Sequence, residues 1–221
     1  MKLETLRERG ESMSRALGRE SYEAGAGLVA ETHFAQIFES FADLASEDAW
    51  GAAEGHPMLM EWVADSRIGR AVAPLDDRLH AWESTAELVL DDGERMPFHR
   101  AGIAIANEPR RERRLAVDRA RRAVLGEPIA LRTERLGRER DLLGDLLGLG
   151  VVAARERLSG IDLTALAEQC RGFLDRTGDL HRDTLAGRLR QELQLKIGDA
   201  DRTDGAFLFR GAAYDEFFPA D

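Results

Sequence analysis

Apolar residues recur along most of the chain at spacings of three and four, which is the period of an amphipathic α-helix. A wide apolar stripe between Leu28 and Leu44 predicts a helix that faces a core. The longest such segment begins at Asp162, a capping residue, and its apolar positions continue to Leu193. Cys170 lies in the apolar register of this segment, which predicts a buried structural thiol.

Proline and glycine divide the helical pattern into segments. Pro57 suits a first helical turn, and Pro74 is predicted to open the next helix, which ends at Gly93. Asn107 is predicted to cap a helix whose first turn contains proline. A further helix is expected over residues 128–147.

These patterns predict an all-α fold, a multi-helix bundle of about eight or nine helices. At most one short extended segment is expected, near residues 96–105, and Phe98–Ile105 is its candidate. We interpret residues 1–221 as a single helical domain. An alternative subdivision separates N-terminal helices in 1–92 from the middle helix pair, long helix and C-terminal aromatic segment in 93–221.

The composition is typical of a soluble protein, with 43% apolar and 33% charged residues. Its one cysteine excludes an intramolecular disulfide and fits a reducing compartment. No uninterrupted apolar run reaches the roughly 18 residues of a membrane span. The charged N-terminus lacks the apolar core of a signal peptide. We therefore expect a cytoplasmic protein with no membrane partner.

Charge is unevenly distributed within a net charge of −10. Residues 94–141 carry 13 basic and 8 acidic residues and form a basic block. A basic block can bind nucleic acid, but acidic residues interleave with these arginines at helical spacing, and apart from Phe98 no aromatic residue that could stack on bases lies among them. A solvated, salt-bridged helix face is the better interpretation, and no nucleic-acid partner is expected.

One helix face combines carboxylates with a histidine, namely Asp76, Asp77, His80, Glu83 and Glu87. The spacing of Asp77 and His80 resembles half of a di-metal carboxylate motif. That chemistry requires a second such motif and two further carboxylates, which the sequence does not supply. A solvated helix face is the preferred interpretation, and a metal-dependent helical-bundle enzyme is a weaker alternative.

Residues 199–205 superficially resemble a calcium-binding loop. The sixth and twelfth positions of such a loop require glycine and a bidentate glutamate, but Asp204 and Arg210 occupy them here. The calcium interpretation is therefore rejected. The sequence also has no HExxH, GxSxG or phosphate-binding glycine loop. We assign no catalytic, cofactor-binding or metal-binding residue in this chain.

Four segments, taken in order, carry a family resemblance. They are Ala106-Asn-Glu-Pro-Arg-Arg-Glu-Arg-Arg114, Ser159-Gly-Ile-Asp-Leu163 with the helix that follows it, Asp201-Arg-Thr-Asp-Gly-Ala-Phe-Leu-Phe-Arg210, and Tyr214-Asp-Glu-Phe-Phe-Pro-Ala220. Together they resemble the helical N-terminal region of bacterial zinc metallopeptidases of the thimet oligopeptidase and oligoendopeptidase F class.

This resemblance implies a mostly helical front half that forms one wall of a channel for short peptides. The zinc and its HExxH ligands would belong to a catalytic half, which this sequence does not contain. We expect no peptidase activity from the chain alone. Phe207, Phe209, Phe217 and Phe218 are the expected docking face for the catalytic half or for another protein partner.

The sequence is also compatible with two alternatives. The four aromatic residues could belong to a C-terminal helix that packs back onto the bundle. The chain could also be a self-standing helical adaptor, a protein-interaction domain that buries the same residues against a partner or a second copy.

Overall fold

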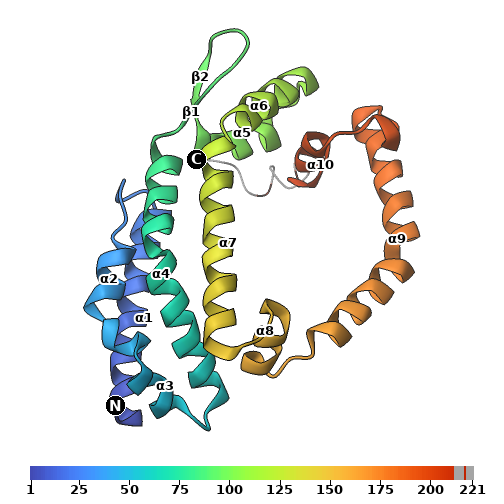
Figure 1. The fold of residues 1–221 in the computed structure, drawn as a ribbon. Coiled ribbons are helices and arrows are strands. Elements are labelled where there is room, and N and C mark those ends of the chain that lie inside the picture. The colour runs from blue at the N-terminus through green and yellow to red at the C-terminus, as the bar shows by residue number, and fades with distance from the viewer. Residues whose placement is uncertain (212–216, 218–221) are drawn as a thin grey trace. The chain divides into compact units, whose positions relative to one another are not determined.

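The computed structural model of the chain describes residues 1–211 and Phe217. Within these residues it contains ten α-helices and a small two-stranded sheet, which confirms the predicted all-α fold (Figure 1). The helices are α1 (Leu3–Gly25), α2 (Phe34–Ser40), α3 (Glu47–Ala53), α4 (Pro57–Thr85), α5 (Ala101–Asn107), α6 (Arg111–Ala123), α7 (Gly126–Leu147), α8 (Val151–Ser159), α9 (Leu163–Leu193) and α10 (Arg202–Phe209). Three short 3-10 helices and two strands complete the fold: η1 (Ala42–Ala45), η2 (Phe98–Arg100), η3 (Ile197–Asp199), β1 (Glu87–Val89) and β2 (Arg95–Pro97).

Tertiary contacts divide the chain into two compact units, each made of two separate stretches. The first unit comprises residues 1–85 and 126–166, and the second comprises residues 86–125 and 167–221. The subdivision after residue 92 stays a prediction, as does the single domain.

Helix α4 is the central element of the first unit, where it contacts α2, α3, α7 and α8. Helices α4 and α7 lie side by side (Figure 1). An ion pair of 2.8 Å joins Asp76 of α4 to Arg135 of α7. A second pair, also 2.8 Å, joins Glu83 to Arg132. These two pairs add to the apolar packing that holds the helices together.

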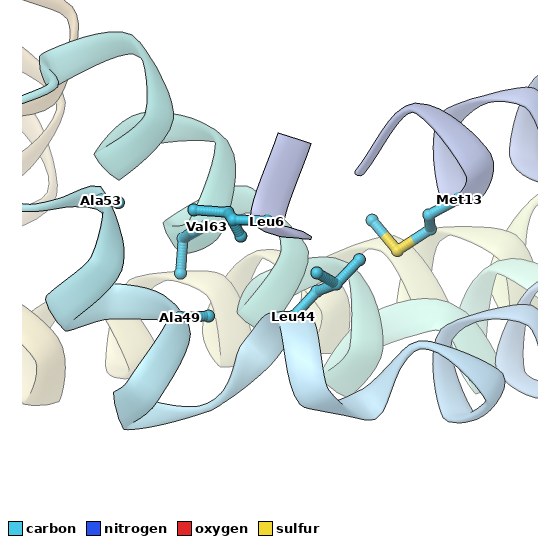
Figure 2. Close-up of a cluster of buried hydrophobic side chains, with 6 residues drawn as sticks. All are labelled: Leu6, Met13, Leu44, Ala49, Ala53 and Val63. Carbon is cyan, nitrogen blue, oxygen red and sulfur yellow. The ribbon is translucent and has the colours of Figure 1, made fainter. Parts of the chain in front are cut away.

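The core of the first unit is formed by apolar side chains from several helices. Figure 2 shows side chains from α1, η1, α3 and α4 pointing toward one another; they are Leu6, Met13, Leu44, Ala49, Ala53 and Val63. Ser46 begins α3 because its hydroxyl accepts a hydrogen bond from the Ala49 amide. Ala49 and Ala53, about one turn apart in α3, are both fully buried.

The sequence interpretation of Pro74 as a helix start is wrong, because α4 continues through it from Pro57 to Thr85. An interior proline removes one backbone hydrogen bond and is unfavourable in an isolated helix. Here Val72, Ala73 and Leu75 are buried around it. Their packing in the core favours the continuous helix.

A hairpin in the second unit replaces the predicted end of that helix. Strands β1 and β2 pair antiparallel, with Leu88 opposite Met96. Gly93 has a φ of +85° in the connecting turn, a conformation in which glycine avoids the usual steric penalty. The extended segment therefore ends at Pro97, whereas Phe98–Ile105, expected to be extended, forms η2 and most of α5.

The boundary between α5 and α6 also differs from the expectation. Asn107 is the last residue of α5, and its side-chain amide donates to the Ile103 carbonyl instead of capping the next helix. Helix α6 begins at Arg111, and the Glu108 carboxylate accepts the Arg110 amide just before it. In contrast, Asp162 caps α9 as predicted, by accepting the Ala165 amide.

None of the helices in the described part of the chain is both long and apolar enough to cross a membrane.

Candidate functional site

The acidic face of α4 is engaged in structural contacts. The Asp77 carboxylate accepts hydrogen bonds from the Thr32 hydroxyl and from the Phe34 and Ala35 amides, at 2.7, 2.9 and 3.0 Å. It therefore binds the N-terminal turn of α2, where backbone N–H groups lack helical partners. Among the residues described, no group of three metal-binding side chains gathers here or elsewhere.

The other four residues that the sequence placed on this face do not converge on one point. Asp76 and Glu83 pair with arginines of α7, and Glu87 pairs with Arg95 across the hairpin at 2.7 Å. His80 has a buried Nε2 without a hydrogen-bond partner in the described structure. The four acidic side chains thus tie α4 and the start of the hairpin to their neighbours.

A buried ion-pair network joins α6 to α10 in the second unit. Asp204 is fully buried, and its carboxylate lies 2.6 Å from an Nη of Arg114, whose side chain is only 1% exposed. Arg111 donates to the same carboxylate at 3.0 Å. The Asp201 amide donates to it at 2.9 Å, completing a reciprocal capping box at the start of α10.

These donors determine the charge state of Asp204. Burial alone raises the pKa of its carboxyl group, but hydrogen bonds from the Asp201 amide, Arg114 and Arg111 outweigh burial and hold the pKa below its ordinary value. Asp204 is therefore a carboxylate in the folded protein. Although Asp204 lies in the calcium-like segment 199–205, its carboxylate caps α10 and pairs with Arg111 and Arg114.

Asp118 forms a second linkage between the same helices. Its carboxylate pairs with Arg202 of α10 and, at 2.7 Å, with Arg122 one turn along α6. Burial raises the pKa of Asp118, but the hydrogen bond and charge of Arg202, with those of Arg122, lower it overall. The two linkages lock α10 onto α6 and leave each buried carboxylate matched by arginine.

The basic block is only partly a solvated face. Pairs such as Arg138 with Glu134 are exposed and follow the predicted i,i+4 pattern. Arg114 and Asp118, in contrast, are buried, because α10 covers this part of α6. Sequence spacing indicated a charged helix but could not show which of its charges α10 would cover.

The C-terminal aromatic residues have different environments. The Arg114 guanidinium lies over the Phe207 ring, 4.5 Å from its centroid, and Phe207 is half-buried. Phe209 and Phe217 are 59% and 68% exposed. Phe218 lies outside the described residues. The proposed docking face of four phenylalanines therefore reduces to two exposed rings within the part of the chain that the structure describes.

Several large apolar side chains are exposed along α9. Of its 31 residues only Leu189 is buried. We use the name α9 stripe for four exposed residues of the second unit that share one face of the helix: Cys170, Phe173, Leu174 and Leu180. An uncovered apolar stripe of this kind is typical of a surface that binds another protein element.

The prediction of a buried Cys170 is wrong, since the thiol is exposed within the α9 stripe. The apolar register of α9 was identified correctly from the sequence. The burial of Cys170 was inferred from this register alone, which does not show whether another element packs on the helix. The sequence signal that could have indicated exposure is weak: glycine, threonine and charged residues interrupt the apolar positions of α9.

Comparisons with known proteins give no assignment: no protein-family model, curated protein or solved structure matches the chain.

Proposed function

We propose that this chain is the non-catalytic helical front half of a zinc-dependent oligopeptidase-like protein of the bacterial cytoplasm. In this proposal it supplies a wall of the peptide-binding channel. Zinc and the hydrolytic residues belong to a catalytic half, and peptide hydrolysis occurs only when the two are joined or associated. The support from the sequence is the ordered resemblance of four segments to oligoendopeptidase-class enzymes.

The structural observation that carries the proposal is the α9 stripe. Full burial of a large apolar side chain contributes roughly 1.5–3 kcal/mol. The stripe leaves Phe173, Leu174 and Leu180 at 57%, 63% and 70% exposure, so most of this contribution remains available to a partner. Helix α9 begins within the segment Ser159–Leu163, which also carries part of the family resemblance.

The first test is to read the coding sequence that follows codon 221 and the neighbouring genes for an HExxH motif. The encoded catalytic half, produced separately, is then mixed with this chain, zinc and an internally quenched peptide. We expect hydrolysis only in the mixture. We also expect Cys170 to react quickly with a thiol reagent in the chain alone and at least tenfold more slowly in the complex, because the stripe is then covered.

Two variants make this test specific. Leu174→Asp introduces a charge into the α9 stripe and is expected to abolish both the complex and the protection of Cys170. Leu136→Asp places the same charge at an exposed leucine of α7, 62% accessible, and serves as the matched control. The proposal fails if no HExxH polypeptide is encoded, or if Leu174→Asp leaves association unchanged.

A self-standing helical adaptor is the second candidate, because the same stripe could bind a different protein or a second copy. This function predicts a dimer or a stable complex without any metallopeptidase half. Light scattering after gel filtration distinguishes the two. A concentration-dependent dimer in which Cys170 becomes protected would favour the adaptor.

A further inference from the structure

A groove between α1 and the start of α4 is a second candidate binding surface, in the first unit. It encloses about 530 Å³, a volume within the range of small-molecule sites. Its floor is formed by Leu6, Gly10, Leu59 and Trp62. Leu59 and Trp62 are half-buried and pack against the core of the first unit, so the floor is anchored.

Gly10 determines how the aromatic part of this floor is arranged. A Cβ atom at Gly10 would lie 3.1 Å from Cη2 of Trp62, closer than about nine in ten real contacts of a Cβ atom. Glycine therefore allows the six-membered ring of the indole to lie against the backbone of α1. The result is an aromatic surface beside an open groove.

The rim of the groove carries unmatched positive charge. Arg7 and Arg15 are exposed, and neither guanidinium makes an ion pair or hydrogen bond with any described residue. Neighbouring arginines of α1 behave differently: Arg9 pairs with Asp43 and Arg19 pairs with Glu23. Glu11 lies between the two rim arginines, so two positive charges face one negative charge.

We propose that this groove binds a small aromatic carboxylate. The aromatic ring would lie against Trp62, since aromatic pairs gain energy beyond their buried area. Arg7 or Arg15 would hold the carboxylate, because the planar guanidinium matches a carboxylate with two parallel hydrogen bonds. This site is independent of the α9 stripe and of any catalytic half.

The test is calorimetric titration of the full chain with 1-naphthaleneacetate and with the neutral 1-naphthaleneacetamide, which has the same ring. We expect the acid to bind at least about tenfold more tightly than the amide, a difference of about 1.4 kcal/mol. The double variant Arg7→Gln/Arg15→Gln should lose about tenfold in affinity for the acid. Both positions are exposed, so circular dichroism should show an unchanged fold.

Arg19→Gln is the matched control, because it removes a positive charge from α1 outside the groove lining. It should bind the acid as the unmodified chain does. The proposal is overturned if the amide binds as tightly as the acid, or if the double variant keeps full affinity. It is also overturned if no binding occurs up to about 5 mM acid, a concentration that already corresponds to very weak affinity.

Discussion

Replacement of Asp204 by asparagine is expected to lower the free energy of unfolding by about 3–5 kcal/mol, the cost of removing one partner from a buried ion pair. Arg114, 1% exposed, would keep its charge without a carboxylate opposite it. The reciprocal cap of α10 would also lose its charged acceptor for the Asp201 amide. Urea unfolding followed by circular dichroism measures the loss.

Asp179→Asn provides the comparison for this variant. Asp179 pairs with Arg182 at 2.7 Å, but its side chain is 87% exposed. Exposed pairs contribute about 0–1 kcal/mol, so the unfolding midpoint should hardly change. If the two substitutions lower the free energy of unfolding equally, burial does not account for the contribution of the Asp204 network to stability.

Acid should destabilise the protein through the buried carboxylates of this network and through Glu108. Asp204 and Asp118 have folded-state pKa values below the ordinary 3.8. Hydrogen bonds from the Arg110 side chain and amide, with the charges of Arg110 and Arg113, lower the pKa of Glu108 from 4.5 to about 2. Because these pKa values are lower in the folded state, their contribution is complete above the unfolded values. It is lost as the pH falls from about 5 toward about 2.

The pH profile can be measured by urea unfolding at a series of pH values. Stability should be nearly constant above about pH 5 and should fall steadily below it. The Asp204→Asn variant should show a shallower fall, since one of the coupled carboxylates is absent. A profile as steep as that of the unmodified protein would show that Asp204 does not take part.

Gly69→Ala is expected to destabilise the first unit by about 1–3 kcal/mol through overpacking. A Cβ atom at Gly69 would lie 2.3 Å from Cζ of Phe38, so α2 and α4 could not keep their present distance. Phe38 packs against the core of the unit and has little freedom to move. The loss would appear as a lower midpoint in thermal and urea unfolding.

Gly18→Ala, in the interior of α1, tests the same chemical change without the steric conflict. No atom lies within 4 Å of a Cβ at this position. The substitution should stabilise the helix by about 0.5–1 kcal/mol, because alanine loses less backbone entropy than glycine on folding. We therefore expect Gly69→Ala to lower the free energy of unfolding and Gly18→Ala to raise it. Stabilisation by Gly69→Ala would disprove the close contact.

Local sequence signals determined the helices of this protein, since helical period and caps depend on neighbouring residues. The period predicted the all-α fold, and Asp162 correctly indicated the start of α9. Local signals failed where packing opposed them. Pro74 lies inside α4 because the core favours one continuous helix, and Asn107 ends α5 instead of capping α6.

Only the tertiary structure decided which apolar and charged faces are covered. Arg114 and Asp204 are 90 residues apart in sequence, and no local pattern specifies that they meet. The α9 stripe, which includes Cys170, has the same apolar register as a core helix, yet it is exposed. The helical period of the sequence determines the helix face on which a residue lies, whereas the burial of that residue depends on whether another element packs on this face.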